Sequence, residues 1–546
     1  MENSTKYKDF NSFFNYDPQG VISVPALVKG RLVYPIPPSI HRLQGVAEKI
    51  ALAQSTGDLH CQFSVDGVHV IRQAIIDQNS KQLTGEYQFQ IFAIPDPGSL
   101  IESDTALLAR ELYALPFSEI QNYLNALKDA LCTHMQMILQ VGKFNNANSA
   151  LNDQTIELLF SQIPALFDAE ALGEAVDREL GTCVAPGRRY LDAWVEDPQV
   201  VAHRGMTARF AEHIFATEFF NVSQSQSAKV RAVPTRQLHI TSGNSPFIPL
   251  ISLLRGLATK SAVVVKTAAE VAIINSIIAY AMLDVDSEHP ITRHTSLVYW
   301  RGGDRQVEDV LFAEGAFDRL IVWGAPDAVT SIKSRTSNSK VIFLNPRYGL
   351  SLLDLRVATS REITTAAVKA SIDSLIANQK ACSASLLHYI VGNREQGLQY
   401  CQELIKVLAL WDQYMPHVVP NYIQGQIRML RRGVLLRGIW LTNGTSSYTS
   451  SAVVYMAEPF EIQLHPMSRF IIVRCIESAD EILPYLNASV SAIGVYPDAL
   501  IPEMRDYIAA AGVNNICALG NCERAYSGMP HDGMQILSEL VNWSVN

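Results

Sequence analysis

The spacing of apolar residues divides the chain into regions of different character. From about residue 43 to about residue 230, apolar side chains recur mainly at helical intervals, and a short alternating stretch near residues 60–91 predicts a strand pair. From residue 237 onward, short runs of β-branched and bulky apolar residues alternate with helical stretches. This alternation predicts a mostly parallel sheet with helices on both faces, and such sheets bind ligands at the carboxyl ends of their strands.

Several apolar runs are the predicted strands of this sheet, and helical stretches separate them. No GxGxxG sequence follows any of these strands, so the usual dinucleotide fingerprint is missing and a nucleotide needs another form of phosphate contact. The predicted strands are LHITSG, AVVVKTA, TSLVYW, FDRLIVWG and KVIFLNP, and the predicted helices are PFIPLISLLRGLATK, EVAIINSIIAYAML, RQVEDVLFAEG and APDAVTSIKSRT.

The two ends of the chain have patterns of their own. Residues 1–45 are predicted to form an extended arm, because Pro35, Pro37 and Pro38 argue against a helix before about Leu43. The C-terminal part predicts a further α/β set, which ends in the loop SGMPHDG and a last helix, MQILSELVNW.

One cysteine stands where a predicted helix passes into a predicted strand. Cys382 lies between the helical stretch AAVKASIDSLIA and the strand LLHYIV. Small neighbours such as Ala381 and Ser383 leave room for a substrate carbonyl, and backbone N–H groups of the loop are expected to lower the thiol pKa and to hold an oxyanion. The alternative is a buried free cysteine, which is the usual state of a cysteine in a chain of this kind.

Other polar positions are candidates for chemistry, each with a structural alternative. Asn244 follows a strand and precedes a proline that can begin a helix, so its amide can donate a hydrogen bond at the sheet edge, unless it bonds within its own turn. Lys266 ends a strand and can reach a ribose or phosphate, unless it is solvated. His531 and Asp532 suggest a general base, but a turn ending at Gly533 is the favoured interpretation.

Composition and charge indicate a large globular protein. The 546 residues suggest roughly two to four domains, and the net charge of −9, without a basic block, argues against nucleic acid as a partner. The polar first residues carry no secretory signal, and the most apolar stretch contains Lys266 and Glu270, so we expect a cytoplasmic protein without a membrane span. Scattered cysteines indicate reduced thiols, and the CxxxxC spacing of Cys517 and Cys522 is weak evidence for metal, so no metal site is predicted.

Seven segments in a fixed order resemble the long-chain acyl-CoA reductase family, the LuxC-type fatty acid reductases of bacterial bioluminescence operons. They are HITSGNSP, VVVK, YWRGGD, VWG, NPRYGLS, NQKACS and PHDG, and the similarity covers about residues 40–545. That family resembles a branch of the aldehyde dehydrogenase superfamily. The resemblance implies an α/β, aldehyde-dehydrogenase-like fold with a Rossmann-type cofactor domain, an α/β catalytic domain and a helical N-terminal region.

The resemblance also implies roles for single residues. Cys382 would attack an acyl thioester and become acylated, while the Asn244 side-chain amide and the Cys382 backbone N–H stabilise the oxyanion. Lys266 matches the lysine that holds the adenosine ribose, and Gly324 matches the glycine near the cofactor phosphates and nicotinamide. Ser242 and Thr267, in or next to the same motifs, are the other predicted cofactor contacts.

Departures from ordinary aldehyde dehydrogenases refine these expectations. Those enzymes usually have a glutamine two residues before the cysteine, whereas Gln379 stands three before, as in the acyl-CoA reductases. They also carry a water-activating glutamate where this chain reads FLNPRYGLSLL, so reduction or thiol exchange is the expected fate of an acyl-enzyme. Ala269 stands where a ribose-binding glutamate is common, and Glu270 is one residue too late, so NADPH is the predicted cofactor and NADH the alternative.

These expectations combine into one predicted organisation and activity. Residues 1–45 form the arm, 46–360 the helical region and NAD(P)-binding domain with its sheet from about 237, 361–525 the catalytic cysteine domain, and 526–546 a C-terminal loop and helix. The predicted reaction is NADPH-dependent reduction of a long-chain acyl-CoA or other acyl thioester to the fatty aldehyde through an acyl-cysteine. The alternatives are an aldehyde dehydrogenase that acts oxidatively and a non-reducing acyl-carrier or scaffold subunit. Predicted partners are acyl-CoA or an acylated protein, such as an acyl-protein synthetase, and further copies of this chain.

Overall fold

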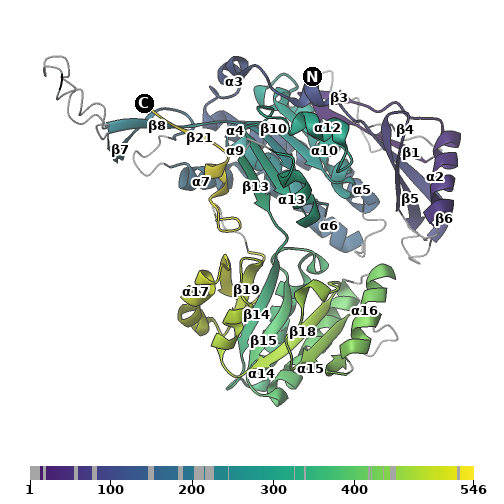
Figure 1. The fold of residues 1–546 in the computed structure, drawn as a ribbon, viewed down its shortest axis with the longest axis vertical. Helices are drawn as coiled ribbons and strands as arrows, with labels where there is room; N and C mark the ends of the chain where they lie inside the picture. Colours follow the sequence, from purple (N-terminus) through teal and green to yellow (C-terminus); the bar gives the residue numbers. More distant parts are fainter. Residues whose placement is uncertain are drawn as a thin grey trace.

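The protein has two lobes, each built around a seven-stranded sheet (Figure 1). The upper lobe holds most of the chain before β14 and also the C-terminal end, and the lower lobe holds the cysteine segment. Among the described helices, none is both long enough and apolar enough to cross a membrane. The computed structural model describes residues 13–15, 20–54, 60–76, 83–145, 153–181, 189–201, 214, 227–243, 245–324, 326–336, 340–415, 419, 421–434, 436–442, 451–524 and 529–546.

The first sheet confirms the predicted α/β alternation. Its strand order is β13-β12-β9-β10-β11-β2-β3, in which the strands from β13 to β11 are parallel and the last two are antiparallel additions at one edge. The carboxyl ends of β9, β10 and β12 lie side by side, because these three strands are neighbours. The predicted strands correspond to β9 (Arg236–Ile240), β10 (Ala262–Thr267), β11 (Thr295–Tyr299), β12 (Arg319–Trp323) and β13 (Lys340–Leu344).

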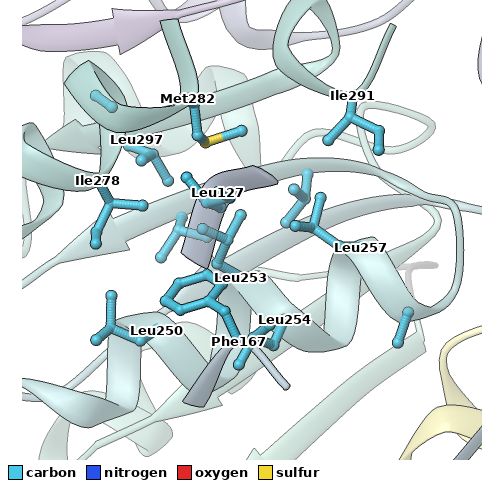
Figure 2. Packing of buried hydrophobic residues seen from close by; sticks show 14 of the residues in the cluster. Leu127, Phe167, Leu250, Leu253, Leu254, Leu257, Ile278, Met282, Ile291 and Leu297 are labelled. Carbon is cyan, nitrogen blue, oxygen red and sulfur yellow. The ribbon is translucent and has the colours of Figure 1, made fainter. Parts of the chain in front are cut away.

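Alternate residues of the central strands face two different apolar layers. Val263 and Val265 pack with α9 and α10, whereas Val264 packs with α12 and α13 on the other face. Figure 2 shows side chains of α9 and α10 against Leu127 of α4 and Phe167, which explains why these two helices are apolar nearly all round. The helices are α3 (Thr105–Glu111), α4 (Phe117–Thr133), α5 (Met135–Asn145), α6 (Asp153–Ser161), α7 (Ala169–Glu179), α9 (Phe247–Ala258), α10 (Ala272–Asp286), α11 (Pro290–Arg293), α12 (Arg305–Leu311) and α13 (Pro326–Lys333).

The second sheet contains the cysteine segment near its centre. Its strand order is β16-β17-β18-β15-β14-β19-β20, and its strand pairs are parallel except for β16 with β17. The chain passes from the first sheet to the second between β13 and β14. The elements are β14 (Tyr348–Asp354), α14 (Ser360–Leu375), β15 (Ser385–Val391), α15 (Arg394–Tyr414), α16 (Asn421–Val434), β16 (Gly438–Leu441), β17 (Ala452–Met456), β18 (Phe470–Ile476), β19 (Val490–Tyr496), α17 (Ile501–Ala510) and β20 (Asn515–Ala518).

The N-terminal predictions need correction where distant segments pair. The predicted strand pair is instead three strands, which form a four-stranded sheet with β1, and two strands lie at the end of the region predicted as helical. Local periodicity does not report such partners, because strand formation depends on the neighbouring strand as much as on the residues themselves. These elements are β1 (Val21–Val24), β2 (Ala26–Val28), β3 (Arg31–Val33), α2 (Ile40–Gln54), β4 (His60–Val65), β5 (Val68–Ile76), β6 (Leu83–Phe92), β7 (Val195–Val201) and β8 (Ser227–Val233).

The last predicted helix is correct only in its first part. Helix α18 (Ile536–Glu539) is a single turn, and the following segment is the strand β21 (Asn542–Val545). Strand β21 pairs antiparallel with one edge of β8, and β7 pairs with the other edge. Strand β21 therefore supplies hydrogen-bond partners to an edge of β8 that would otherwise be unpaired. Pairing with β8 therefore determines the conformation of these residues, although their apolar spacing is helical.

A buried arginine of the first sheet anchors this C-terminal segment. Arg319, at the start of β12, donates hydrogen bonds to the carbonyl oxygens of Glu539 and Val541 at 2.8 and 2.7 Å. It also donates to Oδ1 of Asn542 at 2.7 Å. Hydrogen bonds from a charged group are stronger than neutral ones, so this side chain fixes the path of the last residues across the upper lobe.

We expect Arg319→Ala to release the C-terminal segment without unfolding the sheet. Loss of these hydrogen bonds leaves buried carbonyl groups unpaired, which costs about 1.5 to 3 kcal/mol. Amide hydrogen exchange of residues 536–545 should accelerate by about 10- to 100-fold, while exchange in β10 stays unchanged. The matched control is Arg305→Ala, whose side chain is exposed and lies 3.9 Å from Asp309. Equal exchange in both variants would contradict the anchoring role.

Candidate functional site

Cys382 lies on an exposed loop between α14 and β15. Helix α14 begins with a capping box, in which Thr359 and Glu362 each accept the other's backbone N–H. It passes into the short η5 (Ile376–Gln379) just before the cysteine. The predicted helix-to-strand transition is therefore confirmed, and the alternative of a buried cysteine is wrong.

Two residues just before the thiol have backbone conformations that L-amino acids rarely adopt. The φ angle is 52° at Asn378 and 68° at Gln379, in the left-handed region. Asparagine tolerates this region, but for glutamine the conformation costs about 1 to 3 kcal/mol. The Gln379 amide offsets this cost, because Nε2 donates to the carbonyl oxygen of Phe470 at 2.8 Å and Oε1 accepts from the Phe470 backbone N–H at 3.0 Å.

The buried side chain of Arg469 also holds the cysteine loop in place. Arg469 has a side chain that is only 1% exposed, and its Nε donates to Oδ1 of Asn378 at 3.1 Å. Its other nitrogens donate to Oδ1 of Asp412 and to the carbonyl oxygen of Met415, each at 2.6 Å. A buried charge is tolerated when it is paired and its donors are satisfied, so Arg469 binds the loop firmly to the end of α15.

Strand β14 supports the residues that follow the cysteine. The backbone N–H of Gly349 donates to the carbonyl oxygen of Ala384 at 2.8 Å. A Cβ atom at Gly349 would lie well inside contact distance of the Ser383 carbonyl oxygen, so only glycine permits this close approach. Cys382 is thus presented by a loop that is fixed on both sides.

The surroundings of Cys382 raise the pKa of its thiol above the ordinary value. Although the side chain reaches solvent, desolvation by the surrounding protein is the largest cause, and the negative charge of Asp532 raises the pKa further. A hydrogen bond from the Ser491 side chain, the backbone N–H of Cys382 and the charge of Arg347 act in the opposite direction. The backbone N–H of Cys382 lowers the thiol pKa, as expected. The combined effect of all the surrounding groups is nevertheless to raise it.

The predicted cofactor residues lie at the carboxyl edge of the first sheet. Ser242 follows β9, Lys266 and Thr267 end β10, and Gly324 follows β12, and these three strands are neighbours. The structure therefore brings these four positions to one edge. Asn244 lies outside the residues that the structure describes.

This edge has features that fit a dinucleotide. Lys266 is only 8% exposed, and its Nζ lies 5.9 Å from the ring centres of both Tyr299 and Trp300, so the cation is not simply solvated. A Cβ atom at Gly324 would lie 3.3 Å from Cβ of Ala328, a distance that leaves no easy room for a side chain. Bare backbone therefore precedes α13, and the N-terminus of a helix favours a phosphate group.

The loop before α18 forms a tight turn. His531 and Met534 exchange two backbone hydrogen bonds of 2.9 Å. Asp532 and Gly533, between them, have φ angles of 53° and 79°. The predicted turn at Gly533 is therefore confirmed.

This turn touches elements of both lobes. The ring of His531 lies 5.1 Å from the ring of Trp323, the last residue of β12, and these rings meet edge to face. The carboxylate of Asp532 lies 3.1 Å from Nε of Arg347, just before β14. The turn thus connects the edge of the first sheet with the side of the second sheet that supports the cysteine loop.

Sequence reasoning missed most of the groups that surround the thiol from other elements. Asp532 was considered as a general base together with His531, but a turn was the favoured interpretation, and Arg347, in NPRYGLS, received no assignment. Ser491, in β19, gives no signal, because a serine in a strand has no distinguishing pattern. The bonds of Gln379 and Arg469 join residues about 91 positions apart in the chain, which local patterns do not reveal.

Comparisons with known proteins agree on a family and a fold. The family model described as acyl-CoA reductase (LuxC) matches residues 214–543. The long-chain acyl-protein thioester reductase of Vibrio harveyi is 26% identical over 319 residues, which cover 58% of this chain and 65% of that protein. The protein of the same description from Photorhabdus luminescens is 25% identical over 58% of this chain and 64% of its own length. The chain therefore spans less than two thirds of the length of these relatives.

A solved structure shows the same architecture at low sequence identity. The aldehyde dehydrogenase 21 of Physcomitrella patens superposes with a TM-score of 0.67 at 10% identity, over 96% of this chain and 97% of that one. This likeness establishes the aldehyde-dehydrogenase-like fold that the sequence predicted, and at this identity it concerns the fold alone.

We expect Gln379→Met to loosen the cysteine loop and destabilise the lower lobe. Methionine has a similar volume but leaves the Phe470 N–H and carbonyl unpaired, which costs about 2 to 5 kcal/mol in total. Scanning calorimetry should show a melting temperature lower by about 5 °C or more. Gln402→Met, on the exposed face of α15, is the control and should melt like the wild type. An unchanged melting temperature in Gln379→Met would show that the clamp is dispensable.

The raised pKa of Cys382 predicts a basic pH profile for its alkylation. Thiolate is the reactive form, so the rate with iodoacetamide should keep rising with pH beyond about 8.5, the usual value for a free cysteine. The rate is measured by mass spectrometry of the peptide that contains Cys382. Exposed Cys132 provides an internal comparison in the same sample. A midpoint for Cys382 below about 8.5 would contradict the described surroundings.

Proposed function

We propose that this chain, which belongs to the acyl-CoA reductase (LuxC) family, reduces a long-chain acyl thioester to the fatty aldehyde with NADPH. The observation that carries the proposal is the exposed thiol of Cys382 on a loop fixed by Gln379 and Gly349. The relatives' description as long-chain acyl-protein thioester reductases supports the substrate class. The aldehyde-dehydrogenase-like fold supports a nicotinamide cofactor.

Cys382 is the nucleophile of the proposed reaction. Its sulfur attacks the thioester carbonyl, the carrier thiol leaves, and the acyl group remains on the enzyme as a new thioester. A thioester carbonyl is electrophilic enough to accept a hydride, and the resulting thiohemiacetal breaks its carbon–sulfur bond to release the aldehyde. The Asn244 amide and the Cys382 backbone N–H are the proposed donors to the oxyanion in both steps.

NADPH is the proposed source of the hydride. Lys266, Thr267, Ser242 and Gly324 are the residues that would hold it at the carboxyl edge of the first sheet, and when bound it supplies two electrons as hydride. Ala269 opens η4 (Ala269–Val271) and places no carboxylate at a position where one would repel a 2′-phosphate. This is the support for NADPH over NADH.

The fixed loop and the missing carboxylate disfavour the alternatives. An oxidative aldehyde dehydrogenase needs a base to activate water, and residues 343–353 contain no carboxylate. A non-reducing acyl carrier would keep Cys382 but would not need a bound nicotinamide. Reduction therefore accounts for the missing carboxylate and for the proposed cofactor edge, whereas each alternative leaves one of them unexplained.

Further aspects of the proposal follow from the family and the fold. We propose that the acyl donor is either acyl-CoA or an acylated partner protein such as an acyl-protein synthetase, and that the enzyme works in the cytoplasm as a homo-oligomer. We also propose a catalytic domain that begins near Tyr348, where the second sheet starts, and not at residue 361.

We expect single-turnover reduction by the wild type and none by Cys382→Ala. Each protein receives labelled long-chain acyl-CoA and then NADPH or NADH, and both bound label and released aldehyde are followed. The wild type should bind label and release it as aldehyde, faster with NADPH, whereas the alanine variant has no nucleophile and should bind none.

Cys132→Ala is the control for the loss of an exposed thiol, and it should behave as the wild type. Label that leaves only as free acid would indicate a hydrolase. Label that stays bound with either nucleotide would indicate the acyl carrier.

A further inference from the structure

The thiol of Cys382 needs a base, and the segment that leads from the end of β13 into β14 carries a cation near it and no carboxylate. Residues 343–353 contain Arg347 and no carboxylate. The pKa of this thiol is raised, so it holds its proton more firmly than an ordinary cysteine does. Attack on a thioester therefore requires a group that accepts the thiol proton as the new bond forms.

A short chain of contacts leads from the cysteine loop to a carboxylate of the C-terminal turn. The backbone of Gly349 contacts Ser383 and Ala384, immediately after the cysteine. Arg347, two residues earlier, pairs with Asp532 at 3.1 Å. Asp532 is thus brought to the same side of the second sheet as the cysteine loop, although it is 150 positions later in the chain (532 minus 382).

The position of Asp532 is held by several groups. Its side chain is only 9% exposed, and the tight turn between His531 and Met534 fixes its backbone. Arg347 is in turn fixed by a hydrogen bond of 2.5 Å from Nη1 to Oδ1 of Asn514. The C-terminal segment beyond the turn is anchored to the first sheet, so the carboxylate is placed by both lobes.

Burial and the neighbouring charges act in opposite directions on the carboxyl group of Asp532, and its pKa is raised above the ordinary value. Burial raises the pKa of its carboxyl group, whereas the cations of Arg347 and Arg255 lower it and keep the carboxylate form available. The negative charge of Asp532 raises the pKa of the Cys382 thiol and also that of Arg255, while the neutral side chain of Ser491 hydrogen-bonds to the Cys382 sulfur. The charge of Asp532 reaches the Cys382 thiol, and groups that perturb each other's pKa in this way are typical of functional sites.

We propose that Asp532 is the general base that accepts the proton of the Cys382 thiol during acylation. This assignment rests on the proposed function, because it concerns the first step of that reaction. As the Cys382 sulfur bonds to the acyl carbon, its proton passes to a carboxylate oxygen of Asp532. When the bond between the acyl carbon and the carrier sulfur breaks, the carrier thiolate takes this proton from Asp532. No group is oxidised or reduced in the exchange.

Asp532→Asn separates a base from a mere neighbouring charge, because the two roles predict opposite changes. Loss of the negative charge lowers the pKa of Cys382, so iodoacetamide should alkylate the variant faster than the wild type at pH 7. If the carboxylate is the base, acylation by labelled long-chain acyl-CoA at pH 7 should nevertheless fall by about 100-fold. The acid limb of the pH profile for acylation should also disappear, and Asp532→Glu should restore part of the rate.

The control variant is Asp506→Asn, whose carboxylate is 90% exposed on α17 and should leave both rates unchanged. Acylation of Asp532→Asn that is as fast as wild type, or faster, would overturn the inference and leave the proposed function intact. Alkylation and acylation slowed by the same factor would also overturn it, since that result indicates a displaced thiol. Wild-type protein that takes up no label would overturn the proposed function itself.

Discussion

The paired hydrogen bonds between the Gln379 amide and the backbone of Phe470 are the constraint on which the candidate site depends. They hold in place the left-handed residues Asn378 and Gln379, which precede Cys382 with Lys380 and Ala381 between, a conformation that the chain would not keep by itself. Because one side chain occupies both the donor and the acceptor of Phe470, the loop cannot shift along β18 without losing both bonds. The exposed thiol therefore has a defined position even though it lies on a loop.

The candidate site also requires that residues from both sheets, which are built from different parts of the chain, lie close together. The C-terminal turn meets this requirement, because His531 contacts Trp323 at the edge of the first sheet while Asp532 pairs with Arg347 beside the second. Arg319 then fixes the following residues to the first sheet. A chain that returns to its first sheet after completing its second sheet thus links the proposed cofactor edge to the proposed nucleophile.

The sequence predicts the parts of the fold that depend on local patterns. The strands from β9 to β13 and the approach to Cys382 follow from apolar runs, because buried parallel strands and their helices each have a distinct periodicity. Strand β21 was predicted as helix, since its pairing with β8 is a distant contact that its own residues do not encode.

The candidate site likewise has residues that the sequence predicts and contacts that it does not. Cys382 and Lys266 follow from residue type at the end of an element, and their proposed roles come from the resemblance. The Gln379 clamp and the Arg347–Asp532 pair could not be predicted, because each joins segments that only the folded chain brings together.

The most direct measurement is to find which residue carries the acyl group when the protein is given a long-chain acyl thioester without nucleotide. Peptide mapping by mass spectrometry locates the modification, and a second sample is treated with NADPH before digestion. The account predicts an acyl group on the peptide containing Cys382, absent from the sample that received NADPH. An acyl group on Cys517 or Cys522, or one on Cys382 that persists after NADPH, would contradict it.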